Sequence, residues 1–197
     1  MKLDLDFYMR KDVVKIARKL LGKSLFTRFD GKLTGGIITE TEAYAGVTDR
    51  ASHAYGGRRT ARTEIMYMQG GTAYVYLCYG VHSLFNVVTN IEGVPHAVLI
   101  RAIFPTTGLD TIRARRNSGN KALQKICAGP GTVSSGLGIH YSHTVISLLD
   151  NKIWIEDKQV DIDEKQIITG PRVGVDYAGT DALLPYRFIL KEGFPIE

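Results

Sequence analysis

Residues 24–44, SLFTRFDGKLTGGIITETEAY, have the pattern of two β-strands joined by a tight turn. Residues 24–28 have the composition of a short β-strand, and the Asp30-Gly31 dipeptide that follows them is typical of a two-residue hairpin turn. We predict that the returning strand runs over residues 33–44, with a β-bulge at Gly35-Gly36. A hairpin of this kind pairs its two strands antiparallel.

The rest of the chain adds more strands and a few short helices. Asp12 precedes apolar residues at helical spacing and Gly22 follows them, which predicts an amphipathic helix with a capped start and a defined end. Short basic helices are predicted at 109–116 and 121–127, and a turn at Gly129-Pro130-Gly131. Further strands are predicted at residues 72–79, 84–89, 94–104, 153–155, 167–169 and 187–190.

Strands that follow one another through short turns pair antiparallel. We therefore predict a single α+β domain over residues 1–197, built as a curved antiparallel β-sheet with short helices at its edges.

The composition agrees with one globular domain. The chain has 197 residues, of which 44% are hydrophobic and 23% charged, and no apolar stretch approaches the length that spans a bilayer. The first residues include Asp4, Asp6 and Asp12 and do not resemble a signal or transit peptide. Two cysteines and five scattered histidines form no disulfide framework and no recognisable metal site. We expect a cytoplasmic, nucleoid-associated protein, or a nuclear one in a eukaryote, with no metal and no membrane segment.

Positive charge is concentrated in the first two thirds of the chain. Residues 1–130 carry 19 basic and 10 acidic side chains, whereas residues 131–197 carry 6 and 10. A field of this sign attracts phosphate groups, although many basic proteins bind no nucleic acid. The acidic stretch 150–164 is predicted to form solvated turns.

Two carboxylates lie close together near the end of the predicted strand 33–44. Alternation along a strand places Glu40, Glu42 and Tyr44 on one face. Burying carboxylates costs free energy unless they are paired or used chemically, so these residues are either a functional pair or the solvated side chains of an edge strand. Arg101 lies within the apolar run 98–104 and needs a partner for the same reason, and Glu40 or Glu42 is the obvious candidate.

The loop over residues 45–71 is long for a compact domain, and such loops are usually functional or disordered. It holds His53, two adjacent glycines and several arginines, which suits close approach to phosphates but also fits a solvated loop. The strand that follows contains Tyr74, Tyr76 and Tyr79, and tyrosines in this setting either stack on bases or pack in a core.

Taken together, these features resemble the alkyladenine DNA glycosylase family, also called the 3-methyladenine or N-methylpurine DNA glycosylase family. The resemblance runs in order along nearly the whole chain, and the ordered set is far more specific than any one motif. Its motifs are Glu40-Thr41-Glu42-Ala43-Tyr44, His53, Gly56-Gly57-Arg58, Thr60, Arg62, Met66, Gly71-Thr72-Ala73-Tyr74-Val75-Tyr76, Tyr79-Gly80, Asn86, Val98-Leu99-Ile100-Arg101-Ala102, Gly129-Pro130-Gly131, Leu137-Gly138-Ile139, Pro171-Arg172-Val173-Gly174 and Pro185-Tyr186-Arg187-Phe188.

The resemblance implies a reaction and its catalytic groups. Such an enzyme rotates a damaged purine out of duplex DNA and hydrolyses its N-glycosidic bond, which leaves an abasic site. Glu42 resembles the general base that activates water, and Arg101 and the carbonyl of Val173 resemble the groups that hold that water. No lysine accompanies Glu42 in the motif, so a monofunctional hydrolase is expected rather than a Schiff-base lyase. Alkylated purines are already activated as leaving groups, so no metal or cofactor is expected.

The resemblance also implies which residues contact the DNA. Tyr44, His53 and Tyr76 resemble the walls that sandwich the extruded base, and Asn86 resembles the residue that crowds the exocyclic amine of guanine. Tyr79 resembles the side chain that is inserted into the gap in the duplex. The residues expected to contact the DNA backbone are Arg58, Arg59, Arg62 and Gly131.

The chain departs from the family pattern after Tyr79-Gly80, where Val81, Ser83 and Leu84 replace more usual residues, and at Thr132, where a lysine is common. These departures bear on damage preference and DNA affinity rather than on the reaction. The expected partner is double-stranded DNA that contains a damaged purine, bound by a monomer. One alternative is a non-enzymatic module that binds duplex nucleic acid on the same fold. A domain for free nucleotides is disfavoured, because the sequence has no phosphate-cradling glycine loop.

Overall fold

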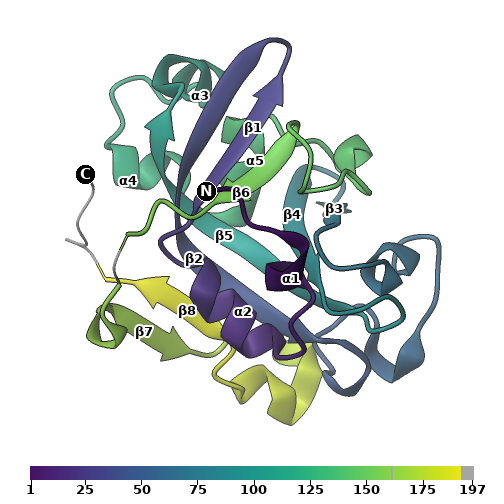
Figure 1. Cartoon of the computed structure of the whole chain (residues 1–197). Coiled ribbons are helices and arrows are strands. Elements are labelled where there is room, and N and C mark those ends of the chain that lie inside the picture. The colour runs from purple at the N-terminus through teal and green to yellow at the C-terminus, as the bar shows by residue number, and fades with distance from the viewer. Residues whose placement is uncertain (161, 192–197) are drawn as a thin grey trace.

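The computed structural model describes residues 1–160 and 162–191. In that part of the chain, eight strands form one antiparallel sheet in the order β3-β4-β5-β2-β1-β6, and β8 pairs with both β2 and β7 (Figure 1). The strands are β1 (Ser24–Phe29), β2 (Lys32–Ala45), β3 (Ala73–Cys78), β4 (His82–Thr89), β5 (His96–Thr107), β6 (Ile153–Glu156), β7 (Ile167–Gly170) and β8 (Arg187–Leu190). The predicted α+β class and the antiparallel sheet are therefore confirmed.

Strand β2 is the centre of this sheet. It pairs with β5 along one edge, and with β1 and then β8 along the other. Asp30 and Gly31 form the predicted turn before it, with φ of 53° and 71°. The predicted bulge is also present, because the register with β5 shifts between Gly35 and Gly36. Gly36 allows the close approach there, since a Cβ atom would lie 2.4 Å from the Phe104 carbonyl oxygen.

Short helices lie beside this sheet. The Asp12 side chain accepts a hydrogen bond from the Lys15 amide at 3.0 Å and begins the second helix as predicted, while Gly22 follows that helix with a φ of 76°. The α-helices are α1 (Leu5–Tyr8), α2 (Val13–Leu20), α3 (Leu109–Arg116), α4 (Leu123–Ile126) and α5 (Pro130–Leu137). No helix in residues 1–160 or 162–191 combines the length and apolar character needed to cross a bilayer.

Two predictions for local structure were wrong. Gly129-Pro130-Gly131 is not a turn but the start of α5, since Pro130 occupies the first helical position, where its missing N–H costs nothing. The acidic residues of 150–164 are not all free in solvent, because Asp157 and Glu164 form ion pairs with Lys23 and Arg18, whereas the strand predicted at 153–155 is present as β6 and residue 161 lies outside the described residues.

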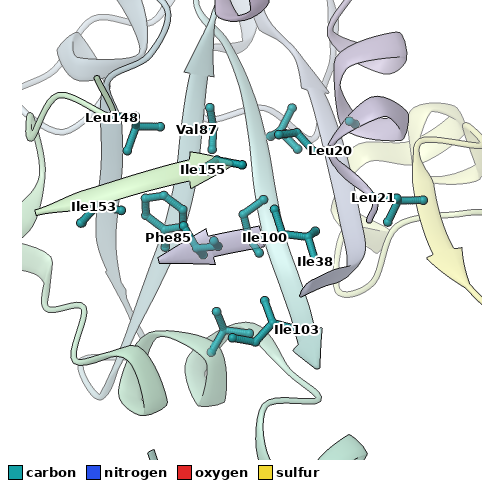
Figure 2. Packing of buried hydrophobic residues seen from close by; sticks show 14 of the residues in the cluster. Leu20, Leu21, Ile38, Phe85, Val87, Ile100, Ile103, Leu148, Ile153 and Ile155 are labelled. Carbon is teal, nitrogen blue, oxygen red and sulfur yellow. The ribbon is translucent and has the colours of Figure 1, made fainter. Parts of the chain in front are cut away.

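The two faces of the sheet have different tasks. Alternate residues of β3, β4 and β5 point into the main apolar core, which α2 and α5 cover, and Figure 2 shows Phe85, Val87 and Ile100 within it. The intervening residues of the same strands line a cavity on the other face, among them Tyr76, Asn86, Leu99 and Arg101. Because successive side chains of a strand point to opposite faces, the same strands supply both the apolar core and the wall of the cavity.

Candidate active site

Glu42 is the centre of the candidate site, and its side chain is fully buried. One carboxylate oxygen, Oε1, accepts a hydrogen bond from the Val173 backbone N–H at 2.8 Å and lies 3.3 Å from the Arg101 guanidinium. The other oxygen, Oε2, accepts from the Tyr44 hydroxyl at 2.8 Å. Burial and the neighbouring Glu42 carboxylate raise the pKa of Tyr44 well above its ordinary value, so Tyr44 keeps its proton and donates. The three groups around Glu42 therefore all direct donor hydrogens at its carboxylate.

A β-bulge directs Arg101 toward the carboxylates. In the register of β2 with β5, Glu40 is opposite Ala102 but Thr41 is opposite Ile100, so Arg101 has no partner residue. Extra residues of this kind turn a side chain out of the regular pleat and are common beside active sites. The Arg101 Nε atom donates to Glu40 Oε1 at 2.8 Å, and its Nη1 atom faces Glu42. Both predicted partners of Arg101 are therefore present together.

Arg187 is a member of the site that the sequence analysis did not assign a role. It lies opposite Glu42 in the register of β8 with β2, and its Nε atom donates to Glu40 Oε1 at 2.6 Å. One carboxylate oxygen of Glu40 thus accepts from two arginines. The signal in the sequence was the same as for Arg101, namely a charged residue in a short apolar strand.

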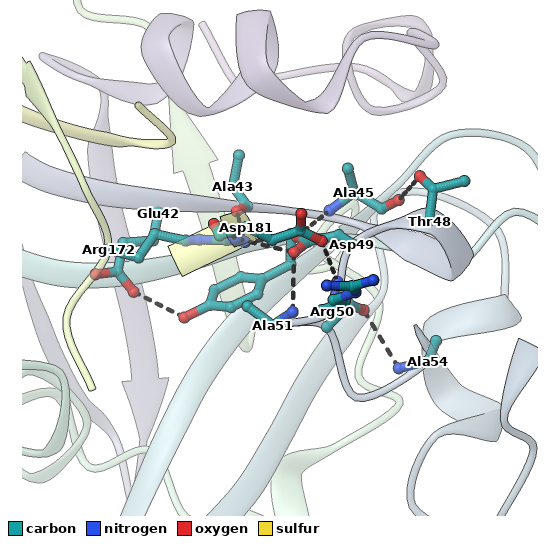
Figure 3. Close-up of polar contacts among 12 residues, drawn as sticks. Glu42, Ala43, Ala45, Thr48, Asp49, Arg50, Ala51, Ala54, Arg172 and Asp181 are labelled. Atoms are coloured by element: carbon teal, nitrogen blue, oxygen red, sulfur yellow. Dashed lines mark hydrogen bonds and ion pairs between the residues drawn. The ribbon is translucent and has the colours of Figure 1, made fainter. Parts of the chain in front are cut away.

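A second buried ion pair holds the segment that carries Val173 (Figure 3). The Arg172 guanidinium is buried, donates to the Asp49 carboxylate through both terminal nitrogens, and also donates to the Ala43 carbonyl at 2.9 Å. Asp49 in turn accepts from the backbone amides of Ala45 and Ala51 at 3.0 Å. This network ties the segment after Arg172 to the end of β2, which places the Val173 amide against Glu42.

An aromatic cavity of about 520 Å³ lies in front of Glu42. Glu42 itself does not line it, but Tyr44, Arg101 and Val173, which surround its carboxylate, form part of the wall. The cavity is large enough for a purine base, and its remaining wall is rich in tyrosine. Other residues that line it are His53, Arg62, Met66, Tyr74, Tyr76, Asn86 and Tyr177.

His53 has a defined protonation state in this wall. Arg62 donates to its Nε2 atom at 3.2 Å, and because a guanidinium only donates, the proton of the neutral ring is on Nδ1, 2.8 Å from the Tyr74 hydroxyl. Burial, Arg62 and Arg58 lower the pKa of His53 from 6.5 to about 4. His53 is therefore uncharged near neutral pH. Its ring meets the Tyr76 ring edge to face, with centroids 4.8 Å apart.

Asn86 is buried in the floor of the cavity. Its amide nitrogen donates to the backbone carbonyls of Tyr74 and Leu84, at 3.2 and 3.3 Å, which fixes the side chain. The rim of the cavity carries Tyr79, which is 94% exposed at the tip of the β3–β4 hairpin with a φ of 50°. Tyr177, a residue that the sequence analysis missed, is a second exposed aromatic at the rim.

The remaining predicted DNA contacts lie outside the cavity. Arg59 pairs with Glu64 and lies over the Tyr67 ring at 3.9 Å. Arg58 is exposed in the same loop, and Gly131 lies in the first turn of α5, where a Cβ atom would be 3.1 Å from His82. Thr132 hydrogen-bonds to both backbone groups of Gly129 and so caps its own helix.

Comparison with known proteins identifies the class to which this fold and site belong. Residues 6–193 match the family model described as methylpurine-DNA glycosylase, and the chain therefore belongs to that family. It is an enzyme, a DNA glycosylase that acts on DNA, so a non-enzymatic binding module is excluded.

Curated relatives agree with this assignment over almost their full length. A protein of Chlamydia felis is 47% identical over 185 residues, which is 94% of each chain. A protein of Bacillus cereus strain G9842 is 43% identical over 188 residues, or 91% of each chain, and one of Chlamydia pneumoniae is 41% identical over 185 residues, or 94% of this chain and 93% of the other. Each of these relatives is named "Putative 3-methyladenine DNA glycosylase".

Proposed function

We propose that this protein removes alkylated or deaminated purines from duplex DNA by hydrolysing the N-glycosidic bond, which leaves an abasic site. The observation that carries the proposal is the buried Glu42, held by Val173, Tyr44 and Arg101 directly behind the wall of an aromatic cavity. The names of the relatives support an alkylated purine as one substrate. Glu42, Tyr44 and Arg101 come from the sheet and Val173 from the segment after β7 of the same chain, which supports a single glycosylase domain acting as a monomer.

Glu42 acts as the general base in this proposal. Breaking the bond between the sugar and the base builds positive charge on the sugar, and water must then attack the C1′ atom. The carboxylate accepts the proton of that water and stabilises the cationic sugar. The water sits where the groups around Glu42 meet the cavity, with the Arg101 guanidinium and the Val173 carbonyl as its other partners.

The cavity accounts for binding and selection of the base. The extruded purine stacks in the cavity against Tyr44, His53 and Tyr76, which all line it. The edge-to-face contact between the His53 ring and the Tyr76 ring holds these two side chains in place. Asn86 is held by two backbone carbonyls and cannot turn away, so it crowds the exocyclic amine of guanine and disfavours the normal base.

Tyr79 fills the gap that the extruded nucleotide leaves. Its side chain is almost entirely exposed at a hairpin tip, so it can be buried against unstacked bases without first leaving a packed position in the protein. Inserting such a side chain offsets part of the unstacking cost, which is about a few kcal/mol for one base step. Replacing Tyr79 with Ala is expected to weaken binding to damaged duplex and to slow base release.

The direct test is base release from duplex oligonucleotides that each carry one hypoxanthine, ethenoadenine or 7-methylguanine. We expect alkali-labile abasic sites in at least one damaged duplex and none in the undamaged control. Absence of a product from all three lesions, with enzyme that binds the DNA, would contradict the proposed substrate class.

A further inference from the structure

Arg62 differs from the other arginines that were predicted to contact the DNA backbone. Arg58 and Arg59 lie outside the cavity, whereas Arg62 lines it. Its guanidinium carbon is 4.4 Å from the centroid of the Tyr76 ring, and its Nη2 atom donates to His53 at 3.2 Å. Arg62, His53 and Tyr76 thus form one part of the wall, and a base bound in the cavity lies within reach of the field of this guanidinium.

The charge of Arg62 is not balanced by its surroundings. Arg101 and Arg187 share the carboxylates of Glu40 and Glu42, and Arg172 is paired with Asp49. Arg62 makes no ion pair with any residue in the described ranges 1–160 and 162–191. Its hydrogen-bond partner, His53, contributes no charge of either sign near neutral pH. Arg62 therefore adds an uncompensated positive charge at this wall of the cavity, on a side chain that is itself exposed to solvent.

We propose that Arg62 determines substrate specificity, by accelerating the release of neutral damaged purines, such as hypoxanthine, relative to purines that carry a positive charge, such as 7-methylguanine. The inference rests on the proposed function and assigns one residue that shifts the preference between neutral and cationic damaged bases.

The charge balance of the reaction provides the reason. When the bond between C1′ and N9 breaks, both electrons stay on the base, the water oxygen bonds to C1′ and one water proton goes to Glu42. Hypoxanthine then leaves as an anion, which a nearby guanidinium stabilises, and it takes up a proton afterwards. A cationic 7-methylguanine leaves as a neutral molecule and gains nothing from that charge. Before the bond breaks, the same guanidinium repels the cationic base.

This inference and a phosphate contact predict different results. A phosphate contact contributes equally to every damaged duplex, because the backbone is the same in each. A cation beside the base changes the ratio of the rates for neutral and cationic bases. The ratio therefore distinguishes the two roles of Arg62 even if the side chain also affects affinity.

The test measures single-turnover release of hypoxanthine and of 7-methylguanine by the unmodified protein and by Arg62→Gln, Arg62→Lys and Arg59→Gln. Loss of the charge in Arg62→Gln is expected to lower the hypoxanthine rate relative to the 7-methylguanine rate by about tenfold or more. Arg62→Lys keeps the charge and should retain most of the ratio. Arg59→Gln removes a cation of the same loop that does not line the cavity, and should leave the ratio unchanged.

An unchanged ratio in Arg62→Gln would overturn the inference, as would equal losses on both substrates that follow weaker DNA binding. If thermal unfolding shows that Arg62→Gln is not folded, the release rates of Arg62→Lys and Arg59→Gln are compared at increasing salt concentration instead. Equal effects of salt on the release rates of hypoxanthine and 7-methylguanine would then contradict the inference. Failure of the unmodified protein to release either base would instead contradict the proposed function, so the two failures are distinguishable.

Discussion

Arg101 takes its position from Glu40 and Arg187 rather than from Glu42 alone. The Glu40 carboxylate accepts from both arginines, at 2.8 and 2.6 Å, and so holds Arg101 at the distance from which it faces Glu42. Because neither Glu40 nor Arg187 lines the cavity, both act through Arg101 and are positioning residues.

Replacing Glu40 with Gln is therefore expected to lower the single-turnover rate by about tenfold to a hundredfold, since small displacements of catalytic groups have effects of this size. Binding of damaged duplex should change little, and Glu40→Asp should recover part of the rate. Glu92→Gln, an exposed residue, is the matched control. A Glu40→Gln protein with an unchanged rate, or one that loses affinity instead of rate, would contradict the positioning role.

His53 gives a prediction for the dependence of stability on pH. Burial, Arg62 and Arg58 lower its pKa from 6.5 to about 4, so the unfolded chain takes up a proton more readily than the folded protein between these values. The contribution of His53 to the unfolding free energy is nearly constant above its unfolded pKa of 6.5, and it falls as the pH is lowered from there toward 4. At pH 4.5 this amounts to about 2–3 kcal/mol relative to pH 7.

His53→Asn should remove this component, so that the variant loses less unfolding free energy between pH 7 and pH 4.5 than the unmodified protein does. Urea unfolding at the two pH values measures the difference. The exposed His82→Asn serves as the control. If His53→Asn shows the same loss as the unmodified protein, His53 is not held neutral by the fold.

The sequence indicated most of the site at the level of single residues. Glu42 and Arg101 stood out because charged side chains interrupted predicted strands, Tyr44 and His53 were assigned through the family resemblance, and the structure brings all four together. The position of Arg62 in the cavity wall could not be predicted from the sequence. A cationic loop residue has the same sequence signal whether it faces phosphate or the cavity, and only the folded loop shows which rings it contacts.

Among the elements, the segment after Arg172 depends on one buried ion pair. Arg172 has its guanidinium against Asp49 and the Ala43 carbonyl, and Val173 follows directly with its amide on Glu42. Removing one partner of a buried pair leaves the other charge without compensation. Loss of the Arg172–Asp49 pair is therefore expected both to release the segment that carries Val173 and to lower the unfolding free energy.

Arg172→Ala is expected to lower the unfolding free energy by about 3–5 kcal/mol, the usual effect of breaking a buried pair. Arg59→Ala, which breaks the exposed pair with Glu64, should change it by less than about 1 kcal/mol. Urea unfolding of both variants makes the comparison. Similar small effects for the two substitutions would show that the Arg172 pair does not hold the segment.

The elements themselves were largely predictable where the signal was local. The hairpin at Asp30-Gly31 and the helix after Asp12 depend on turn and cap residues next to them in the sequence, and both are present. Helix α5 was missed because a Gly-Pro-Gly sequence indicates a turn until the buried Val133 and Leu137 show that the following residues pack on the sheet. Long-range packing of this kind has no local signal.

In the whole molecule, the number of basic side chains that can contact DNA beside the cavity is smaller than the net charge of the chain suggests. Helix α2 covers the core face of the sheet, where the Thr41 hydroxyl donates to the Ala17 carbonyl, and the cavity lies on the opposite face. The acidic residues Asp157 and Glu164 pair with Lys23 and Arg18 beside α2. Part of the positive charge of the amino-terminal residues is thus neutralised by ion pairs within the chain, on the face opposite the cavity.

The salt dependence of DNA binding separates the two basic surfaces. Lys15→Gln combined with Lys19→Gln, on the exposed side of α2, should leave the slope of log affinity against log salt unchanged. Arg58→Gln, in the loop that carries His53, should reduce that slope by about 0.9, the value for one phosphate contact. A reduced slope for the α2 double variant would mean that the duplex also contacts the core side of the molecule.

In the proposed mechanism Glu42 removes the proton from the attacking water, and replacing Glu42 with Gln tests this step. Glu42→Gln keeps the size and the hydrogen-bonding oxygen of the side chain but cannot take up the proton. At saturating enzyme on the best damaged duplex, we predict that its single-turnover rate falls by at least about a hundredfold. Its affinity for that duplex should stay within a few-fold of the unmodified protein. The exposed Glu92→Gln should match the unmodified protein in both. Release by Glu42→Gln within tenfold of the unmodified rate, with DNA binding retained, would contradict the account.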